Sequence, residues 1–317
     1  MPPEGTSSDG VSSNRLRRRF AVVINEASGL QTGVTESVRA AFTLHGLIPV
    51  FIPASVGDLP ARMVRASDSG TEGVVVVGGD GTVACAAQLL AGTGIPLGIL
   101  PTGTMNLVAR DLGIPIGDMA AAVGVLTHTE ACSIDVGEVN GHIFVCASSI
   151  GLLARVAHFR EAGRGRPTLR MWVRIFSGLL RMLSRFRPHR LTLLIDGKSR
   201  TVRTPSLTIS VNLLSDGTGR PLGRAQLDGG VLGVYVFTRL RLADAFRVGL
   251  TALLGRWHED AAIEELSVTE VTVSSRKAAM PVMNDGEVAL FETPLRYRIR
   301  GKALALLTPR AAQIQPS

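Results

Sequence analysis

The 317-residue chain has only three lysines among its 34 basic residues, only three cysteines, and 4% aromatic residues. None of the lysines lies in a GxxxxGK(S/T) pattern, which excludes a Walker-type phosphate-binding loop. Cys85, Cys132 and Cys146 are too few and too scattered for a disulfide framework or a CxxC metal site. This cysteine usage fits a reducing compartment.

Long apolar runs are also absent. No stretch approaches the roughly 18 apolar residues of a membrane-spanning helix, so we expect none. Residues 1–19 are polar, rich in Gly, Ser and Pro, and end in arginines, which predicts a disordered basic tail. The apolar run that follows, Phe20–Ile24, is too short for the apolar region of a signal peptide. We therefore expect a cytoplasmic protein.

Positive charge is in excess, with 34 basic against 26 acidic residues and a net charge of +8. Such an excess favours a partner that carries phosphate, whether a nucleotide, a nucleic acid or an anionic membrane. Nucleic acid is the least supported of these partners, because few aromatic residues lie among the basic ones. We expect no nucleic-acid partner.

One arginine-rich segment carries a charge equal to this whole excess. No acidic residue occurs between Glu161 and Asp196, whereas eight arginines do. Residues 166–187 predict an amphipathic helix with arginines along one stripe and apolar side chains opposite. Such a helix could lie peripherally on an anionic membrane at the inner face. It could also pack on its own domain with a solvated polar face.

Short apolar runs alternate with helical segments over residues 20–128, which predicts an α/β domain with a parallel sheet. The expected strands are 20–24, 48–52, 73–77 and 97–100, and the expected helices are 33–45, 58–67, one after Thr82 and one from about Asn106. Ligands of such sheets bind at the carboxyl ends of the strands. Residues 129–310 hold mostly β-branched, apolar stretches with few helices, which predicts an antiparallel β-sandwich as a second domain.

The first motif, Gly78-Gly79-Asp80-Gly81-Thr82, follows an expected strand and opens a helix. Glycines let the backbone approach an anion, and the free N–H groups of a helix N-terminus hold phosphate. Asp80 would repel that phosphate unless a cation lay between them, so we expect it to act through Mg²⁺. The alternative is a tight turn with Asp80 as the helix N-cap.

Two further loops follow strands at the same predicted sheet edge. Pro101–Asn106 contains Gly103 and Thr104, and Asn25–Gly29 follows the first strand. Each could form a wall of a nucleotide site beside the first motif. Thr104 could instead be a simple helix N-cap, and Asn25–Gly29 an ordinary turn.

Near the C-terminus, Asn284-Asp285-Gly286-Glu287 places two carboxylates around a glycine between apolar strands. Asp-Gly is a strong hairpin-turn signal, so the local pattern by itself favours a plain turn.

These motifs together resemble the diacylglycerol kinase catalytic-domain family, which includes bacterial soluble lipid kinases and sphingosine kinases. The resemblance extends from about residue 20 and is most specific in GGDGT at 78–82, PTGTMNLVARDLGIP at 101–115, IDVGEVNGHIFV at 134–145 and DGE at 285–287. It implies an N-terminal lobe like that of NAD kinases and phosphofructokinases, with a β-sandwich second lobe.

The resemblance also implies a reaction, in which the γ-phosphate of ATP, bound with Mg²⁺, is transferred to a lipid hydroxyl in the cleft between the lobes. Glu287 would be the general base, with Asp285 beside it. The implied nucleotide-site residues are Asn25, Gly78, Gly79, Asp80, Gly81, Thr82, Gly103, Thr104 and Asn106.

The chain departs from the family pattern at several positions. Glu26 replaces a proline, Leu107 replaces the aspartate of GTxND, and Pro53–Ser55 replaces a threonine near the nucleotide. Family members often carry a second aspartate, a ligand of a structural Mg²⁺, where this chain has Gly229; Asp228 beside it could substitute.

Three functions are consistent with the motifs. The first is an ATP-dependent kinase for a diacylglycerol-like or sphingoid-like lipid. The second is an NAD kinase-like nucleotide phosphorylator, because GGDGT occurs there too, although DGE and the 101–115 run argue against it. The third is a non-catalytic lipid-binding regulatory protein, suggested by Gly229 and Leu107.

Overall fold

The computed structural model describes residues 18–25, 33–127, 131–152, 188–215, 223–224, 226–238 and 262–309. Most of the expected N-terminal tail, the expected arginine-rich helix at 166–187 and the loop residues 26–29 lie outside this part of the chain.

The N-terminal lobe is an α/β unit whose four strands are parallel, in the order β2-β1-β3-β4. Buried Val, Ile and Leu side chains dominate three of these strands, as expected where both faces of a sheet are covered, whereas β2 at the edge of the sheet is only partly buried. The strands are β1 (Arg19–Ile24), β2 (Ile48–Phe51), β3 (Val74–Gly78) and β4 (Leu97–Pro101). The helices are α1 (Val34–Leu44), α2 (Leu59–Ser67), α3 (Asp80–Leu90), α4 (Leu107–Asp111) and α5 (Met119–Val125), with a 3-10 turn at Ala54–Val56.

The strand order reverses beside β1, because the chain steps from β1 out to β2 and then back across to β3. Right-handed crossovers therefore place α1 on one face of the sheet and α2 with α3 on the other. Helix α5 packs against α1, and α2 packs against α3. The carboxyl ends of β1 and β3 flank the point of reversal, where ligands of open α/β sheets bind.

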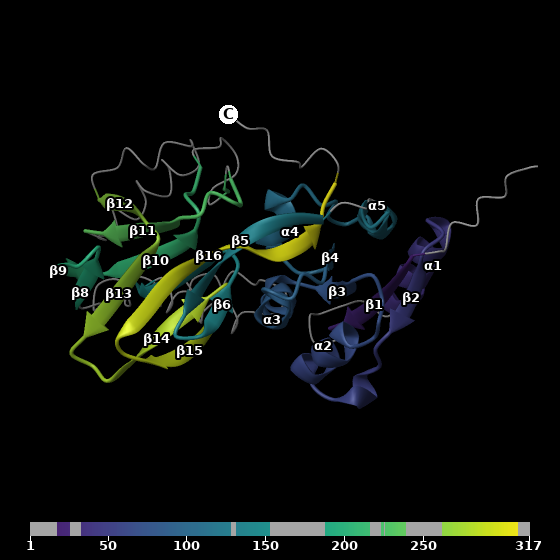
Figure 1. The fold of residues 1–317 in the computed structure, drawn as a ribbon, viewed down its shortest axis with the longest axis horizontal. Helices are drawn as coiled ribbons and strands as arrows, with labels where there is room; N and C mark the ends of the chain where they lie inside the picture. Colours follow the sequence, from purple (N-terminus) through teal and green to yellow (C-terminus); the bar gives the residue numbers. More distant parts are fainter. Residues whose placement is uncertain are drawn as a thin grey trace, which may run out of the picture.

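The second lobe is a sandwich of antiparallel strands (Figure 1). One layer is a six-stranded sheet in the order β12-β11-β10-β7-β14-β15. Its strands are β7 (Ala147–Gly151), β10 (Ser206–Val211), β11 (Leu232–Phe237), β12 (Ile263–Val268), β14 (Ala279–Asn284) and β15 (Glu287–Glu292). The other layer holds β5 (Ala131–Val139), β6 (His142–Phe144), β8 (His189–Ile195), β9 (Lys198–Thr204), β13 (Glu270–Ser275) and β16 (Leu295–Leu307).

Strand β16 joins the two lobes into one continuous sheet. The start of β16 pairs with β13, and most of the strand pairs with β5. Near its end, Leu306 pairs in parallel with Leu97 of β4. The long strand is visible in yellow, running from the sandwich into the N-terminal lobe (Figure 1). A shared sheet fixes the orientation of the lobes, so a loop of one can be held against a loop of the other.

The predicted fold class is confirmed: a parallel-sheet lobe precedes a β-sandwich. The pattern over residues 20–128 did not predict α5. In the second lobe, the apolar stretches 142–150, 199–213 and 266–274, each of which reads as continuous in the sequence, are each divided into two strands. In the described part of the chain, no helix is long and apolar enough to cross a membrane.

Candidate functional site

Each glycine of the Gly78–Thr82 loop is packed against a different partner. A Cβ at Gly78 would collide with the Thr82 side chain, and a Cβ at Gly79 would lie 3.1 Å from the Gly103 Cα. A Cβ at Gly81 would lie 2.5 Å from the Glu287 Oε1 atom. Space, rather than backbone conformation, therefore favours glycine at positions 78 and 79, whereas the neighbour of Gly81 is the flexible end of a side chain. The loop opens α3 with no side-chain cap, which leaves N–H groups of the helix N-terminus for a ligand.

Asn25 and the two loops that follow β3 and β4 meet at one edge of the sheet. Asn25 Nδ2, after β1, donates to the Thr82 hydroxyl over 2.8 Å. The backbones of Gly79 and Gly103 touch, because a Cβ at Gly103 would lie 2.5 Å from the Gly79 Cα. The structure thus brings Asn25, at the end of β1, together with the loops after β3 and β4.

The second loop is locked by Asn106. This buried side chain accepts a hydrogen bond from the Gly103 N–H over 3.1 Å and donates to the Gly103 carbonyl over 2.7 Å. Asn106 is the N-cap of α4, so the alternative of Thr104 as the cap is wrong. Thr104 itself is exposed on the loop.

Asp80 connects the first two loops. It is the first residue of α3 after the Gly79 N-cap, so the N-cap alternative for Asp80 is also wrong. Its Oδ1 atom accepts a hydrogen bond of 2.7 Å from the Leu107 N–H at the start of α4. Burial raises the pKa of the Asp80 carboxyl above 3.8, although backbone N–H groups of residues 106–108 oppose that shift. The substitution at Leu107 keeps this contact, because the backbone makes it.

The predicted turn at Asn284–Glu287 is confirmed and is also part of the site. Asp285 and Gly286 both have positive φ, at 49° and 96°, and connect β14 to β15. The Asp285 carboxylate accepts three backbone N–H groups, from Val145 at 2.7 Å, Cys146 at 2.8 Å and Ala147 at 3.0 Å. Burial raises its pKa, and these three N–H groups oppose the rise.

Glu287 differs from Asp285 in its surroundings. It is an exposed residue at the start of β15, yet its carboxylate lies against Gly81 at the N-terminus of α3. The acid of the second lobe thus faces the glycine-rich loop of the first. Both oxygens of Asp285 are occupied by backbone donors, so Glu287 is the acid of this turn that is available to a substrate.

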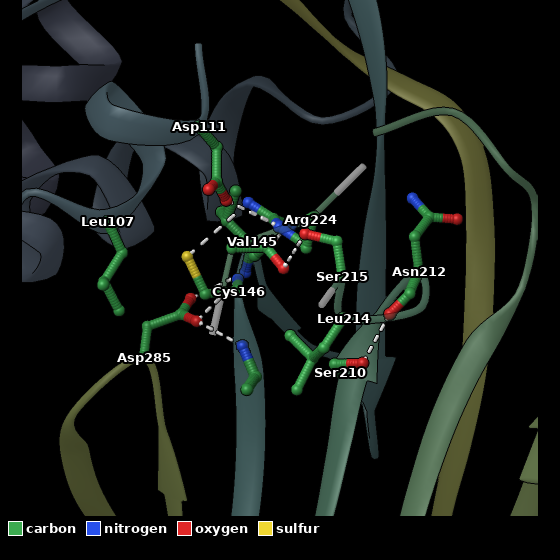
Figure 2. A network of polar contacts seen from close by, with 12 residues as sticks. Leu107, Asp111, Val145, Cys146, Ser210, Asn212, Leu214, Ser215, Arg224 and Asp285 are labelled. Carbon is green, nitrogen blue, oxygen red and sulfur yellow. Dashed lines mark hydrogen bonds and ion pairs between the residues drawn. The ribbon is translucent and has the colours of Figure 1, made fainter. Parts of the chain in front are cut away.

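Sequence reasoning missed the polar residues that bridge the lobes behind this turn. Arg224, just before β11, contacts Asp111 of α4 and the Val145 carbonyl (Figure 2). Gln88 of α3 bonds the backbone of Gly141 and Ile143 around β6. The sequence carries no signal for these pairs, since a single Arg or Gln in a loop does not reveal its partner.

The structural-metal site of family members, which the substitution at Gly229 puts in question, corresponds to the loop before β11. A Cβ at Gly229 would lie 2.9 Å from Asn212 Oδ1, which leaves no room for an aspartate without a shift. Asp228 faces Lys302 Nζ at 3.7 Å, and buried Asp135 binds the N–H groups of Gly230 and Lys302. Among the described residues, no group of three His, Cys, Asp or Glu side chains could hold a metal. The residues described here do not fit a structural metal.

Comparisons with known proteins agree with this architecture. A model of the diacylglycerol kinase catalytic domain matches residues 19–139, and a model of the YegS C-terminal NAD kinase beta sandwich-like domain matches residues 147–308. A crystal structure of a diacylglycerol kinase from Bacillus anthracis strain Sterne has the same fold, with a TM-score of 0.62 at 18% identity, covering 93% of this chain and 98% of that one.

Two curated relatives are also similar along the chain. A diacylglycerol kinase of Mycobacterium tuberculosis strain H37Rv is 30% identical over 318 residues, covering 95% of this chain and 99% of its own. A diacylglycerol kinase of Bacillus subtilis strain 168 is 26% identical over 216 residues, covering 68% of this chain and 70% of its own. These matches indicate that the protein is a lipid kinase. The chain belongs to the diacylglycerol kinase family.

Proposed function

We propose that the protein transfers the γ-phosphate of ATP to a hydroxyl of a diacylglycerol-like or sphingoid-like lipid, with Glu287 as the general base. The observation that supports this most directly is the contact between Glu287 and Gly81, which brings a carboxylate to the loop suited to phosphate. Phosphoryl transfer needs chiefly alignment and neutralisation of oxygen charge, together with an acceptor for the hydroxyl proton.

The N-terminal lobe holds the nucleotide in this proposal. Free N–H groups at the start of α3 bind the phosphates, while Asn25 and Asn106 fix the shape of the surrounding loops. Asp80 keeps its place through the Leu107 N–H and would help to hold the Mg²⁺ that accompanies ATP. Bound Mg²⁺ would supply neutralisation of the phosphate charge. No lysine of a Walker loop contributes here.

The second lobe supplies the acceptor side. Glu287 takes the proton of the lipid hydroxyl as its oxygen bonds to the γ-phosphorus, while the bond from that phosphorus to the β,γ-bridging oxygen breaks and ADP leaves. Asp285 does not exchange protons in this step, because its three N–H bonds hold it as a positioning residue for the turn. The products are a phosphorylated lipid, ADP and a proton.

The substrate class is proposed from the relatives, which are named diacylglycerol kinases. A lipid with acyl chains is presented by a membrane, so we propose a peripheral encounter with the anionic cytoplasmic face. The arginines of residues 166–187 are the sequence feature that would make this contact. Co-sedimentation with anionic vesicles of a variant with Arg170, Arg174, Arg181 and Arg185 changed to Glu should show weaker binding. Unchanged binding would reject this role.

The test of the function offers radiolabelled ATP and Mg²⁺ with a fractionated lipid extract, and with NAD in a parallel reaction. We expect one lipid fraction to gain label, and Glu287→Ala to lower turnover by about 10² to 10⁴ while ATP binding persists. Label in NAD alone would favour the nucleotide phosphorylator. A protein that binds lipid but labels nothing would favour the non-catalytic regulator.

A further inference from the structure

A buried ion pair crosses between the lobes directly behind the acidic turn. Arg224 Nε lies 2.8 Å from Asp111 Oδ2, and the two side chains are 2% and 11% exposed. Asp111 ends α4 in the N-terminal lobe, whereas Arg224 belongs to the second lobe. A buried ion pair is weak support for stability, because desolvation offsets most of its attraction. Its place in the molecule suggests another role.

Arg224 holds the same backbone that holds Asp285. Its Nη1 atom donates to the Val145 carbonyl over 2.6 Å, and its Nη2 atom lies 3.8 Å from the Cys146 sulfur. The N–H groups of the same two residues, Val145 and Cys146, donate to the Asp285 carboxylate. Burial raises the pKa of the Cys146 thiol well above its usual range, so it remains a neutral partner for the guanidinium. Figure 2 shows this sequence of contacts from Asp111 to Asp285.

Helix α4 connects the pair to the phosphate loop. The helix is only five residues long; its first N–H, from Leu107, binds Asp80, and its last residue, Asp111, binds Arg224. The contacts therefore close a ring. They run from Asp80 through α4 and Arg224 to the Asp285 turn, and return through the contact of Glu287 with Gly81.

We propose that Asp111 and Arg224 are a positioning pair that sets the distance between Glu287 and the phosphate loop. This inference rests on the proposed function, since it concerns the base of that reaction. Neither residue is expected to touch a substrate. The role needs arginine, because a planar guanidinium can bind a carboxylate, a carbonyl and a sulfur at once, whereas a lysine ammonium is a single point of charge.

The first experiment compares Arg224→Lys and Asp111→Asn with wild type in steady-state phosphorylation of the lipid fraction that accepts label. We expect kcat to fall by about tenfold to a hundredfold, because a small displacement of a reacting group has effects of this size. The KM for ATP should change less than about twofold. Arg200→Lys is the matched control: Arg200 forms an ion pair with Glu264 in the same lobe, and its change should leave kcat unaltered.

The second experiment separates positioning from a general structural role. Arg224→Lys is combined with Glu287→Ala, and its effect on kcat is measured in both backgrounds. If Arg224 acts through Glu287, its change should lower kcat at least about tenfold in wild type but less than about twofold once the base is gone. Equal losses in the two backgrounds would overturn the proposal.

Two further measurements test the proposal even if a single variant unfolds or the protein labels no lipid. Asp111→Leu combined with Arg224→Met removes both charges and leaves neither alone in the interior, so it should fold and show the same loss of kcat; full turnover would contradict the proposal. Hydrogen exchange at Val145–Ala147 needs no activity. Faster exchange in Arg224→Lys supports the positioning contact even if the proposed reaction fails, and unchanged exchange refutes it.

Discussion

The two ends of the β-sandwich lobe hold their charged groups in different ways. At the end facing the N-terminal lobe, Asp285 and Arg224 are enclosed, and each makes several hydrogen bonds. On the far side, Arg200 and Glu264 form a two-bond pair, at 2.6 and 2.7 Å, whose side chains remain 45% and 39% exposed. The enclosed groups fix a geometry, whereas the exposed pair is solvated and contributes little.

The pKa directions express the same contrast. Burial raises the pKa of Asp80 and Asp285 at the site, while hydrogen bonds from Arg200 lower the pKa of Glu264. For the site acids, the folded state binds protons more readily than the unfolded state, so lowering the pH through the window above 3.8 favours the folded state. For Glu264 the sign is opposite, and its contribution is lost as the pH falls below 4.5.

The largest expected effect is at Asp80. Asp80→Ala removes both the charge next to the phosphates and the acceptor of the Leu107 N–H, and should lower kcat/KM for MgATP by about 10³ or more. Asp80→Asn keeps an acceptor but not the charge, so it separates the two roles. Steady-state assays across Mg²⁺ concentrations provide the measurement. Since Asp80 acts when ionised, its raised pKa should place the acid loss of activity above 3.8. Wild-type activity in Asp80→Asn would refute the metal role.

The next effect is at Asp285. Asp285→Asn places an amide NH₂ among three N–H donors, so at least one of them loses its acceptor. We expect the free energy of unfolding to fall by about 1–3 kcal/mol, and kcat to fall because the Glu287 turn loosens. Thermal and urea unfolding measure the first quantity. Unchanged stability would show that the enclosed end is no more tightly held than the far one.

Gly81→Ala should act on the reaction with little effect on folding. The added Cβ would meet the flexible end of Glu287 at 2.5 Å, so the carboxylate can move away while the backbone stays in place. We expect kcat to fall about tenfold, with the melting temperature close to that of wild type. Gly301→Ala is the control, because its Cβ would meet nothing closer than 3.8 Å. Full activity in Gly81→Ala would remove Glu287 from the role of base.

Much of the site, where the sandwich lobe faces the N-terminal lobe, could be predicted from the sequence. Parallel strands end at a common edge, so the loops at Asn25, Gly78–Thr82 and Pro101–Asn106 had to converge once the alternation of strands and helices was recognised. The Asp-Gly signal likewise predicted the turn at Asn284–Glu287. Only the family resemblance placed that turn opposite the phosphate loop, since local spacing carries no information on contacts between lobes.

The supporting contacts could not be predicted. Arg224 and Asp111 are 113 residues apart, and their meeting depends on β16 joining both lobes into one sheet. The capture of the Asp285 carboxylate depends on backbone N–H groups, which every sequence contains and no motif marks. The departure at Leu107 proved uninformative for the same reason, because the backbone makes the contact there, whereas the departure at Gly229 agrees with residues that do not fit a structural metal.

The smallest expected effect is at the far side of the sandwich. Glu264→Gln removes the charge that pairs with Arg200 and, as in Asp285→Asn, replaces a carboxylate with an amide. The exposed pair should change the free energy of unfolding by less than about 1 kcal/mol, and less still at high salt. The difference between wild type and variant should shrink as the pH falls below 4.5 and vanish once the pH has passed the lowered pKa of Glu264, because Glu264 is then protonated in folded wild type as well. Urea unfolding at pH 7 and at a series of pH values below 4.5, with and without added salt, measures this. A loss of stability as large as that of Asp285→Asn would mean that the difference in burial does not distinguish the two ends of the lobe.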